Sequence, residues 1–387
     1  TFAAMTFAAD ATTRPAGGRI DDPPPWTDLL DGVRTRDDWK IHRERVRQAY
    51  LDLLRDSYKP QRPPLDLQVY ESVEVDGVYE RRLISYAVEA DERAHAYLAI
   101  PTGAQRISNR LETDGASGRS AAQAPGKFPA VIVLHGTTRD GKEQTAALSG
   151  DPTKAYLDHL ARRGYVVIAP DHFVAGHRVP PEGPYETRRF HEKHPEWTAV
   201  GKFTFEHSIA IDVLETLPEV DKARIGVMGH SLGGQGSLFL AAYDERIRAA
   251  AANCTAGTFR HNPGVLHWSR DRWYVYFRHL RPGLLRGELP PIDFHHIMAL
   301  VAPRALLDCS ALNDGDRNMQ KARVQMNVVV SDLYTLLGVP EQFAFYVNGY
   351  GHKSPYESRE LIYAWLDAHL KPPAATQPSL LKPAGEQ

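Results

Sequence analysis

The residue best suited to covalent chemistry is Ser231, in the stretch RIGVMGHSLGGQGSLFL at 224–240. Gly229, His230, Ser231, Leu232 and Gly233 fit the pattern G-x-S-x-G, between an apolar segment typical of a strand and one typical of a helix. Such a tight turn forces strained backbone angles on the serine, and the glycines let strand and helix cross closely. The pattern predicts a serine nucleophile above a sheet edge, with the Leu232 N–H free to stabilise an oxyanion.

A serine hydroxyl needs a base, and the base needs an acid that orients it. In this arrangement the acid and the histidine follow the serine in that order, each just past a strand. Asp314 follows the predicted strand at 304–311, and His352 follows the one at 342–348. These two residues are therefore the predicted acid and base. Two alternatives stay open for Asp314: Asp316 as the acid, or an Asx-turn role for Asp314 itself.

A second oxyanion donor is expected in the loop after an earlier strand. The segment LHGTT leaves the predicted strand at 128–134, and it places Gly136 and Thr137 in that loop. The N–H of Thr137 is the predicted donor, with Gly136 allowing close approach of the substrate oxygen. The alternative is a plain glycine turn.

The elements that must position these residues alternate between short apolar strands and helices. That order predicts an α/β fold with a mainly parallel sheet covered by helices on both faces. Strands are expected at 79–88, 95–100, 128–134, 165–171, 224–229, 248–253, 304–311 and 342–348, and helices at 38–56, 154–164, 204–217, 232–242, 321–338 and 358–370.

The chain divides into three predicted parts. Residues 1–60 form an N-terminal arm with one amphipathic helix, 61–371 the catalytic domain, and 372–387 a C-terminal tail. Three insertions interrupt the alternation, at 102–127, 172–203 and 255–302. Insertions after the carboxyl ends of strands lie over the ligand crevice in such sheets, so the last two are expected to act as caps.

The motifs HGTT, PDHF…GHR, EVDKARIGVMGHSLGG, LVAPRALLDCSALND and YGHKS occur in this order. Over residues 75–371 the chain resembles the α/β-hydrolase superfamily, closest to bacterial dienelactone-hydrolase-like and acetyl-xylan-esterase-like proteins. The resemblance implies Ser231 as nucleophile, His352 as general base, Asp314 as its acid, and Leu232 and Thr137 as oxyanion donors, without metal or cofactor. Dienelactone hydrolases proper use a cysteine nucleophile, so the serine here favours ordinary esters.

The two cap insertions contain candidates for substrate binding. Arg188 is a candidate partner for a substrate carboxylate, such as a uronate, and a solvated surface arginine is the alternative. Trp268 and Trp273 offer faces that stack on sugar rings, whereas packing of the cap explains them equally well. The histidines of 172–203 lack the spacing of a metal site, so no metal is expected.

Bulk properties exclude several function classes. The net charge of −2 does not favour binding to nucleic acid or to an acidic membrane. No apolar run reaches the length needed to span a bilayer. Two cysteines, Cys254 and Cys309, make no disulfide framework and are expected to be buried thiols. The segment TFAAMTFAAD leaves two compartments open: the cytoplasm, or export with the signal peptide already removed. No pattern in the sequence indicates the oligomeric state.

The predicted function is a serine esterase acting on short-acyl or carbohydrate-linked esters, with a small-molecule or carbohydrate ester as its partner. A serine peptidase of the prolyl-oligopeptidase type is one alternative. The absence of propeller-blade repeats upstream of HGTT disfavours it. A hydrolase-fold binding protein without catalysis is the other alternative.

Overall fold

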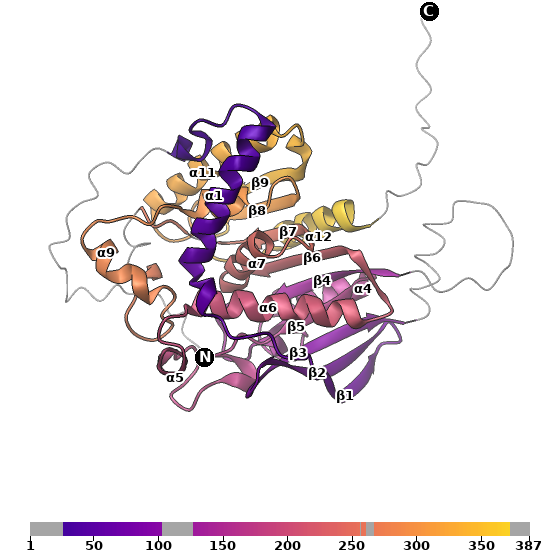
Figure 1. Ribbon diagram of the computed structural model, residues 1–387. Helices are drawn as coiled ribbons and strands as arrows, with labels where there is room; N and C mark the ends of the chain where they lie inside the picture. The colour runs from indigo at the N-terminus through magenta and orange to yellow at the C-terminus, as the bar shows by residue number, and fades with distance from the viewer. Residues whose placement is uncertain (1–25, 103–126, 256, 261–266, 372–387) are drawn as a thin grey trace, which may run out of the picture.

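The computed structural model describes residues 26–102, 127–255, 257–260 and 267–371. Within these residues the chain forms a nine-stranded sheet in the order β1-β2-β3-β5-β4-β6-β7-β8-β9 (Figure 1). The strands are β1 (Gln68–Val75), β2 (Tyr79–Glu89), β3 (Glu92–Pro101), β4 (Phe128–Leu134), β5 (Val166–Pro170), β6 (Val220–His230), β7 (Ile247–Asn253), β8 (Ala305–Ala311) and β9 (Phe343–Asn348).

The α-helices lie mostly between these strands. They are α1 (Arg36–Leu54), α3 (Lys142–Thr145), α4 (Tyr156–Arg162), α5 (Arg188–Lys193), α6 (Ala199–Thr216), α7 (Leu232–Tyr243), α9 (Arg281–Leu285), α10 (Phe294–Ala299), α11 (Arg317–Leu336) and α12 (Tyr356–Leu370). Short 3₁₀ turns are η1 (Trp26–Leu30), η2 (Asp56–Tyr58), η3 (Pro152–Lys154), η4 (Gly176–Arg178), η5 (Arg278–Leu280) and η6 (Pro340–Gln342).

The pairing of neighbouring strands changes once across the sheet, from antiparallel to parallel at β5. From β5 through β4, β6, β7 and β8 to β9, every neighbouring pair is parallel. From β1 through β2 and β3 to β5, every pair is antiparallel. Parallel neighbours need long crossovers, which the helices supply, whereas β2 and β3 need only a short turn. The predicted fold class, a mainly parallel sheet covered by helices on both faces, is confirmed.

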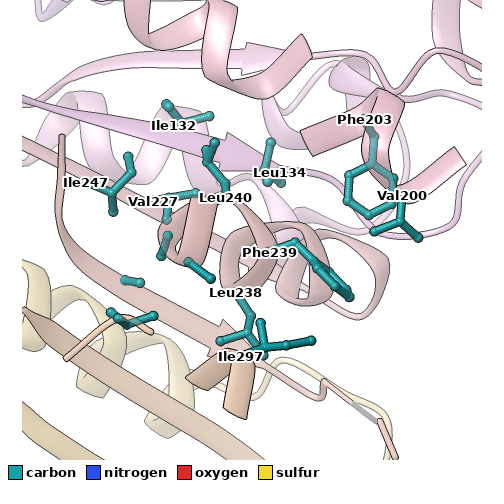
Figure 2. Close-up of a cluster of buried hydrophobic side chains, with 14 of the residues drawn as sticks. Ile132, Leu134, Val200, Phe203, Val227, Leu238, Phe239, Leu240, Ile247 and Ile297 are labelled. Carbon is teal, nitrogen blue, oxygen red and sulfur yellow. The ribbon is translucent and has the colours of Figure 1, made fainter. Parts of the chain in front are cut away.

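Two hydrophobic cores follow from the alternation of side chains along each strand. Ile132 and Leu134 of β4 point to the face covered by α1, α6, α7, α10 and α11. Val131 and Val133 point to the other face, which is covered by α4 and α12. Figure 2 shows part of the first core, where Phe239 of α7 lies among side chains of the sheet and neighbouring helices. Because β4 is buried on both faces, it reads as a continuous apolar run.

The predicted amphipathic helix of the arm packs on this first core. Thr35 and Asp38 form a capping box at the start of α1, and its stripe of Trp39, Val46, Tyr50, Leu53 and Leu54 is buried. The Tyr50 hydroxyl donates to the carbonyl oxygen of Phe239 at 2.7 Å. The helix therefore supports the sheet through α7. The division of the chain at residue 60 stays a prediction.

Several expectations concern residues outside those described: 1–25 of the arm, nearly all of the insertion at 102–127, and the tail at 372–387. The other two insertions contain short helices, α5 in one and α9 and α10 in the other. Across the parts of the chain that the structure describes, none of the helices combines the length and apolar character needed to cross a membrane.

Candidate active site

Ser231 occupies a strained turn between β6 and α7. Its backbone has φ 59° and ψ −120°, a conformation that side-chain-bearing residues rarely adopt. The Ser231 N–H donates to the carbonyl oxygen of Asn253, at the end of β7, at 2.9 Å. The turn is thus anchored to the neighbouring strand, and strain held by its surroundings is typical of functional positions.

Two glycines make this turn possible because the backbone of neighbouring elements comes too close to them for a side chain to fit. A Cβ atom added at Gly229 would lie 2.4 Å from the backbone of Gly233. A Cβ atom added at Gly233 would lie 1.9 Å from the carbonyl oxygen of Leu134, at the end of β4. Such distances leave no room for any side chain, so the glycines of the sequence motif are structural requirements.

The structure brings Ser231, His352 and Asp314 together. His352 Nε2 lies 2.8 Å from Ser231 Oγ, and His352 Nδ1 lies 2.9 Å from Asp314 Oδ2. Since a carboxylate only accepts, Nδ1 carries the proton and Nε2 is free to accept from the serine hydroxyl. The imidazole is half exposed and the Asp314 carboxylate is mostly shielded. The alternative acid, Asp316, instead caps α11 through the N–H groups of Asn318 and Met319.

Asn313 joins the loops that bear Asp314 and His352. Its amide nitrogen donates to Gly349 O at 2.8 Å, and its amide oxygen accepts from the Gly351 N–H at 2.8 Å. Sequence reasoning missed this residue. The signal lay in its position directly before Asp314, but its partners come from a loop more than thirty residues away in sequence.

His230 and Asn253 lie close to His352. The rings of His230 and His352 have centroids 4.9 Å apart, and Asn253 Nδ2 donates to His230 Nδ1 at 3.0 Å. Burial, and secondly the neighbouring His352, holds the pKa of His230 well below its usual value. His230 is therefore neutral and adds no opposing charge when His352 accepts a proton.

Cys254 lies directly beside Asp314 and His352. Its Sγ is 3.4 Å from the carbonyl oxygen of Lys353, next to His352 in the chain. Burial, and then the charge of Asp314, raises the pKa of the Cys254 thiol to about 12. The group is thus a neutral thiol at ordinary pH, which does not suit it as a nucleophile. Cys254 and Cys309 are buried and free, as predicted.

Within the described residues, two groups bring possible metal-ligand atoms within 4.8 Å of one another. One comprises Cys254, Asp314 and His352, and the other Asp28, His295 and His296. In the first, the thiol is protonated and His352 already bonds Asp314. In the second, Asp28 already pairs with His295 at 2.7 Å and with Arg260 at 2.5 Å. Neither group includes a histidine from the insertion at 172–203.

The predicted oxyanion donors flank the serine. Leu232 is the first residue of α7, so its N–H has no partner four residues earlier in the helix. Gly136 abuts the turn, because a Cβ atom added there would lie 3.6 Å from the Ser231 Cβ. Thr137 follows Gly136 and is exposed. The loop predicted to carry the second donor therefore borders Ser231.

The insertions at 172–203 and 255–302 are joined by hydrogen bonds (Figure 1 shows α5 and α9 on the same side of the molecule). The Thr187 hydroxyl donates to Trp273 O at 2.6 Å and accepts from the Val275 N–H at 3.1 Å. Trp273 Nε1 donates to Pro184 O at 3.0 Å. The base of the first insertion is held by a buried ion network, in which Arg178 pairs with Glu206 of α6 and Glu92 of β3.

The substrate-binding candidates differ in accessibility. Trp268 is fully buried among Phe239, Phe277 and Phe294, so stacking on a sugar is corrected to a packing role. Trp273 keeps about a third of its surface exposed. Arg188 is exposed and lies 3.2 Å from Glu182, which leaves its guanidinium partly neutralised at the surface.

Known proteins are similar to this chain in sequence and in architecture. A sequence model of the dienelactone hydrolase family matches residues 117–255, a stretch that contains Thr137 and Ser231 but ends before Asp314 and His352. The carbohydrate esterase MZ0003, from an unknown prokaryotic organism, is 27% identical over 192 residues. The match spans 46% of this chain and 40% of that protein, less than half of either.

Two solved structures extend the likeness over most of the chain. A glucuronoyl esterase from Solibacter usitatus matches with a TM-score of 0.66 and 19% identity, covering 92% of this chain and 98% of that one. A proposed acetyl xylan esterase from Bacteroides fragilis NCTC 9343 matches with a TM-score of 0.58 and 17% identity, covering 86% and 82%. At such identities the likeness establishes a shared fold.

Proposed function

We propose, from the α/β-hydrolase fold that this chain has, that it is a serine hydrolase cleaving carboxylic esters through an acyl-enzyme on Ser231. One observation carries the proposal: the continuous hydrogen-bond chain from Ser231 through His352 to Asp314. A serine hydroxyl within 2.8 Å of an imidazole, which is itself oriented by a carboxylate, is the arrangement that activates the hydroxyl.

In the first half-reaction, His352 Nε2 takes the proton of Ser231 Oγ as that oxygen attacks the ester carbonyl carbon. The carbonyl oxygen becomes an oxyanion, which the N–H groups of Leu232 and Thr137 stabilise. Asp314 stabilises the imidazolium through the Nδ1 hydrogen bond. His352 then gives its proton to the leaving alcohol oxygen, and the acyl group stays on Ser231.

In the second half-reaction, His352 takes a proton from water as the water oxygen attacks the acyl-enzyme carbonyl carbon. The second tetrahedral intermediate collapses, the carboxylic acid leaves, and Ser231 Oγ regains its proton from His352. These steps use side chains and backbone of this chain alone.

The proposed substrates are short-acyl or carbohydrate-linked esters. The similar proteins include a carbohydrate esterase, a glucuronoyl esterase and a proposed acetyl xylan esterase. These names support a substrate with a sugar on one side of the ester bond. The partly exposed indole of Trp273 is the proposed stacking surface, because aromatic faces pack on sugar rings. Arg188 is the proposed partner for a carboxylate on that sugar.

Initial rates on p-nitrophenyl esters from acetyl to octanoyl test the proposal. We expect the parent protein to cleave the short esters, and Ser231→Ala to lower the rate by at least about 1000-fold, because the nucleophile is gone. Acetylated sugars and methyl uronates then rank the natural substrate class. If neither protein cleaves any of these esters, the esterase proposal is wrong.

A further inference from the structure

Tyr185 lies in the first cap insertion, between η4 and α5, and its side chain is buried. Its backbone has φ 63°, a left-handed conformation that is unusual for an aromatic residue. The Tyr185 N–H donates to Val174 O at 2.9 Å, and its ring packs on Tyr274 and Trp273 of the second insertion. The strained backbone and the packed ring together fix where the phenol oxygen lies.

The Tyr185 hydroxyl reaches the loop that carries the predicted second oxyanion donor. It accepts from the Thr138 N–H at 2.8 Å. It lies within donating distance of two carbonyl oxygens, Thr138 O at 2.9 Å and Gly136 O at 3.2 Å. The hydroxyl thus contacts the residues on both sides of Thr137. Burial raises the pKa of Tyr185, so the phenol keeps its proton at any working pH.

The Gly136 carbonyl has a second donor on the same loop. His135 Nε2 accepts from the His172 N–H at 3.0 Å, so the ring proton lies on Nδ1, which donates to Gly136 O at 2.7 Å. Burial lowers the pKa of His135, which keeps this neutral form. The Gly136 carbonyl oxygen thus accepts from His135 and also lies within donating distance of the Tyr185 hydroxyl, whose single proton it shares with Thr138 O.

The direction of that carbonyl determines the direction of the neighbouring N–H. In a trans peptide, the Gly136 C=O and the Thr137 N–H share one plane and point in opposite directions. Holding the carbonyl against Tyr185 and His135 therefore turns the Thr137 N–H away from them. If the plane flipped, a carbonyl oxygen would stand where a donor is needed, and two like partial charges would repel.

We propose that Tyr185 is a positioning residue, which holds the Gly136–Thr137 peptide plane so that the Thr137 N–H serves the oxyanion; this rests on the esterase function proposed above. The first cap insertion then does more than cover the site. It carries, on a strained and packed tyrosine, the hydroxyl that orients one of the two backbone donors.

The test is Tyr185→Phe, with Tyr274→Phe as the matched control. Both changes remove one buried phenol oxygen and keep the ring, but the Tyr274 hydroxyl has no hydrogen-bond partner among the described residues. Loss of a direct oxyanion donor costs about 100- to 1000-fold in kcat. For this indirect role we expect Tyr185→Phe to lower kcat on p-nitrophenyl acetate about 10- to 100-fold at unchanged KM, and Tyr274→Phe to stay within about twofold of the parent.

A second readout separates positioning from structure. A trifluoromethyl ketone forms a tetrahedral adduct with a serine nucleophile, and its oxyanion needs the same donors as the transition state. We expect Tyr185→Phe to weaken inhibition by this probe by the same factor as kcat, with a thermal unfolding midpoint close to that of the control.

Three results would overturn the proposal. The first is parent-like kcat and inhibition in Tyr185→Phe. The second is a loss of activity that follows a raised KM or a lowered unfolding temperature, which would indicate a structural role. The third is a parent protein that neither cleaves esters nor binds the ketone, and this result alone also removes the esterase function.

Discussion

Asp314 and Asp316 lie two residues apart after β8, and their surroundings differ. Asp314 accepts a hydrogen bond from His352, whereas Asp316 accepts from two backbone N–H groups at the start of α11. Sequence alone leaves both open as the acid, because both follow the strand. The choice depends on where the loop bearing His352 comes back to the sheet, and Asn313 links the loops through backbone groups that no motif records.

Exchanging each carboxylate for an amide tests this assignment. We expect Asp314→Asn to lower kcat about 1000- to 10,000-fold, because the amide no longer stabilises the imidazolium. Asp316→Asn should leave kcat within about twofold and change the free energy of unfolding by less than about 1 kcal/mol, since asparagine also caps helices well. Steady-state rates and urea unfolding of the two variants give the comparison. Equal losses of kcat would contradict the assignment of Asp314.

The low reactivity expected of Cys254 gives a second test at the level of single residues, namely whether the nucleophile is Ser231 and not a cysteine. With its pKa raised to about 12 by burial, only a very small fraction of the thiol is ionised at pH 8. We expect iodoacetamide to alkylate the native protein at least about 1000-fold more slowly than a free cysteine, with esterase activity retained. Mass spectrometry over time, with a urea-unfolded sample as control, measures this. Rapid inactivation of the native protein would instead indicate a cysteine nucleophile.

At the level of elements, the accuracy of sequence prediction depended on burial. The run FPAVIVL coincides with β4 because that strand is buried on both faces. Strand β1 was not predicted, since it is an edge strand with mostly exposed side chains and no apolar face to reveal it. Helix α6 begins at Ala199, five residues before its predicted start, because its first turn is buried and lacks polar periodicity. The pairing of the two insertions through Thr187 had no sequence signal.

Burial of α6 has a consequence for acid stability. Burial lowers the pKa of His207 to about 3, whereas an unfolded histidine titrates near 6.5. Below about pH 6.5 the unfolded chain therefore binds a proton at His207 that the folded chain does not bind. The free energy of unfolding falls as the pH is lowered through this range. Between pH 7.5 and pH 5 this residue should cost about 2 kcal/mol of unfolding free energy.

The variant His207→Phe keeps an aromatic ring beside Phe203 and His172 but removes the proton site. We expect its free energy of unfolding to fall about 2 kcal/mol less than that of the parent between pH 7.5 and pH 5. Urea unfolding at both pH values makes the measurement, with pH 7.5 as the internal reference. Parallel pH profiles of parent and variant would contradict this origin of the acid sensitivity.

At the scale of the whole molecule, the predicted resemblance to α/β-hydrolases of the dienelactone-hydrolase and acetyl-xylan-esterase kinds is confirmed by the family match and the shared fold. The strand–helix alternation is local in sequence, and the fold class was predictable from it. The roles of Ser231, Asp314 and His352 stay a prediction, which their observed hydrogen bonds support. The substrate candidates were less predictable, because accessibility depends on distant packing. Trp268 and Trp273, five residues apart, end up buried and partly exposed respectively.

The buried ion network beneath the first insertion bears on how such a protein can change over generations. Arg178 belongs to the insertion, Glu92 to β3 and Glu206 to α6, and Lys202 of α6 pairs with both carboxylates as well. Replacement of Arg178 therefore leaves the two carboxylates sharing Lys202, and the loss of one cation from a buried network favours compensating changes in the other two elements. Beyond it, Arg188 lies at the surface and carries no such obligation, whereas Tyr185 and Thr187 are held by hydrogen bonds to other elements. Exposed positions such as Arg188 can thus change over generations more readily than the base of the insertion.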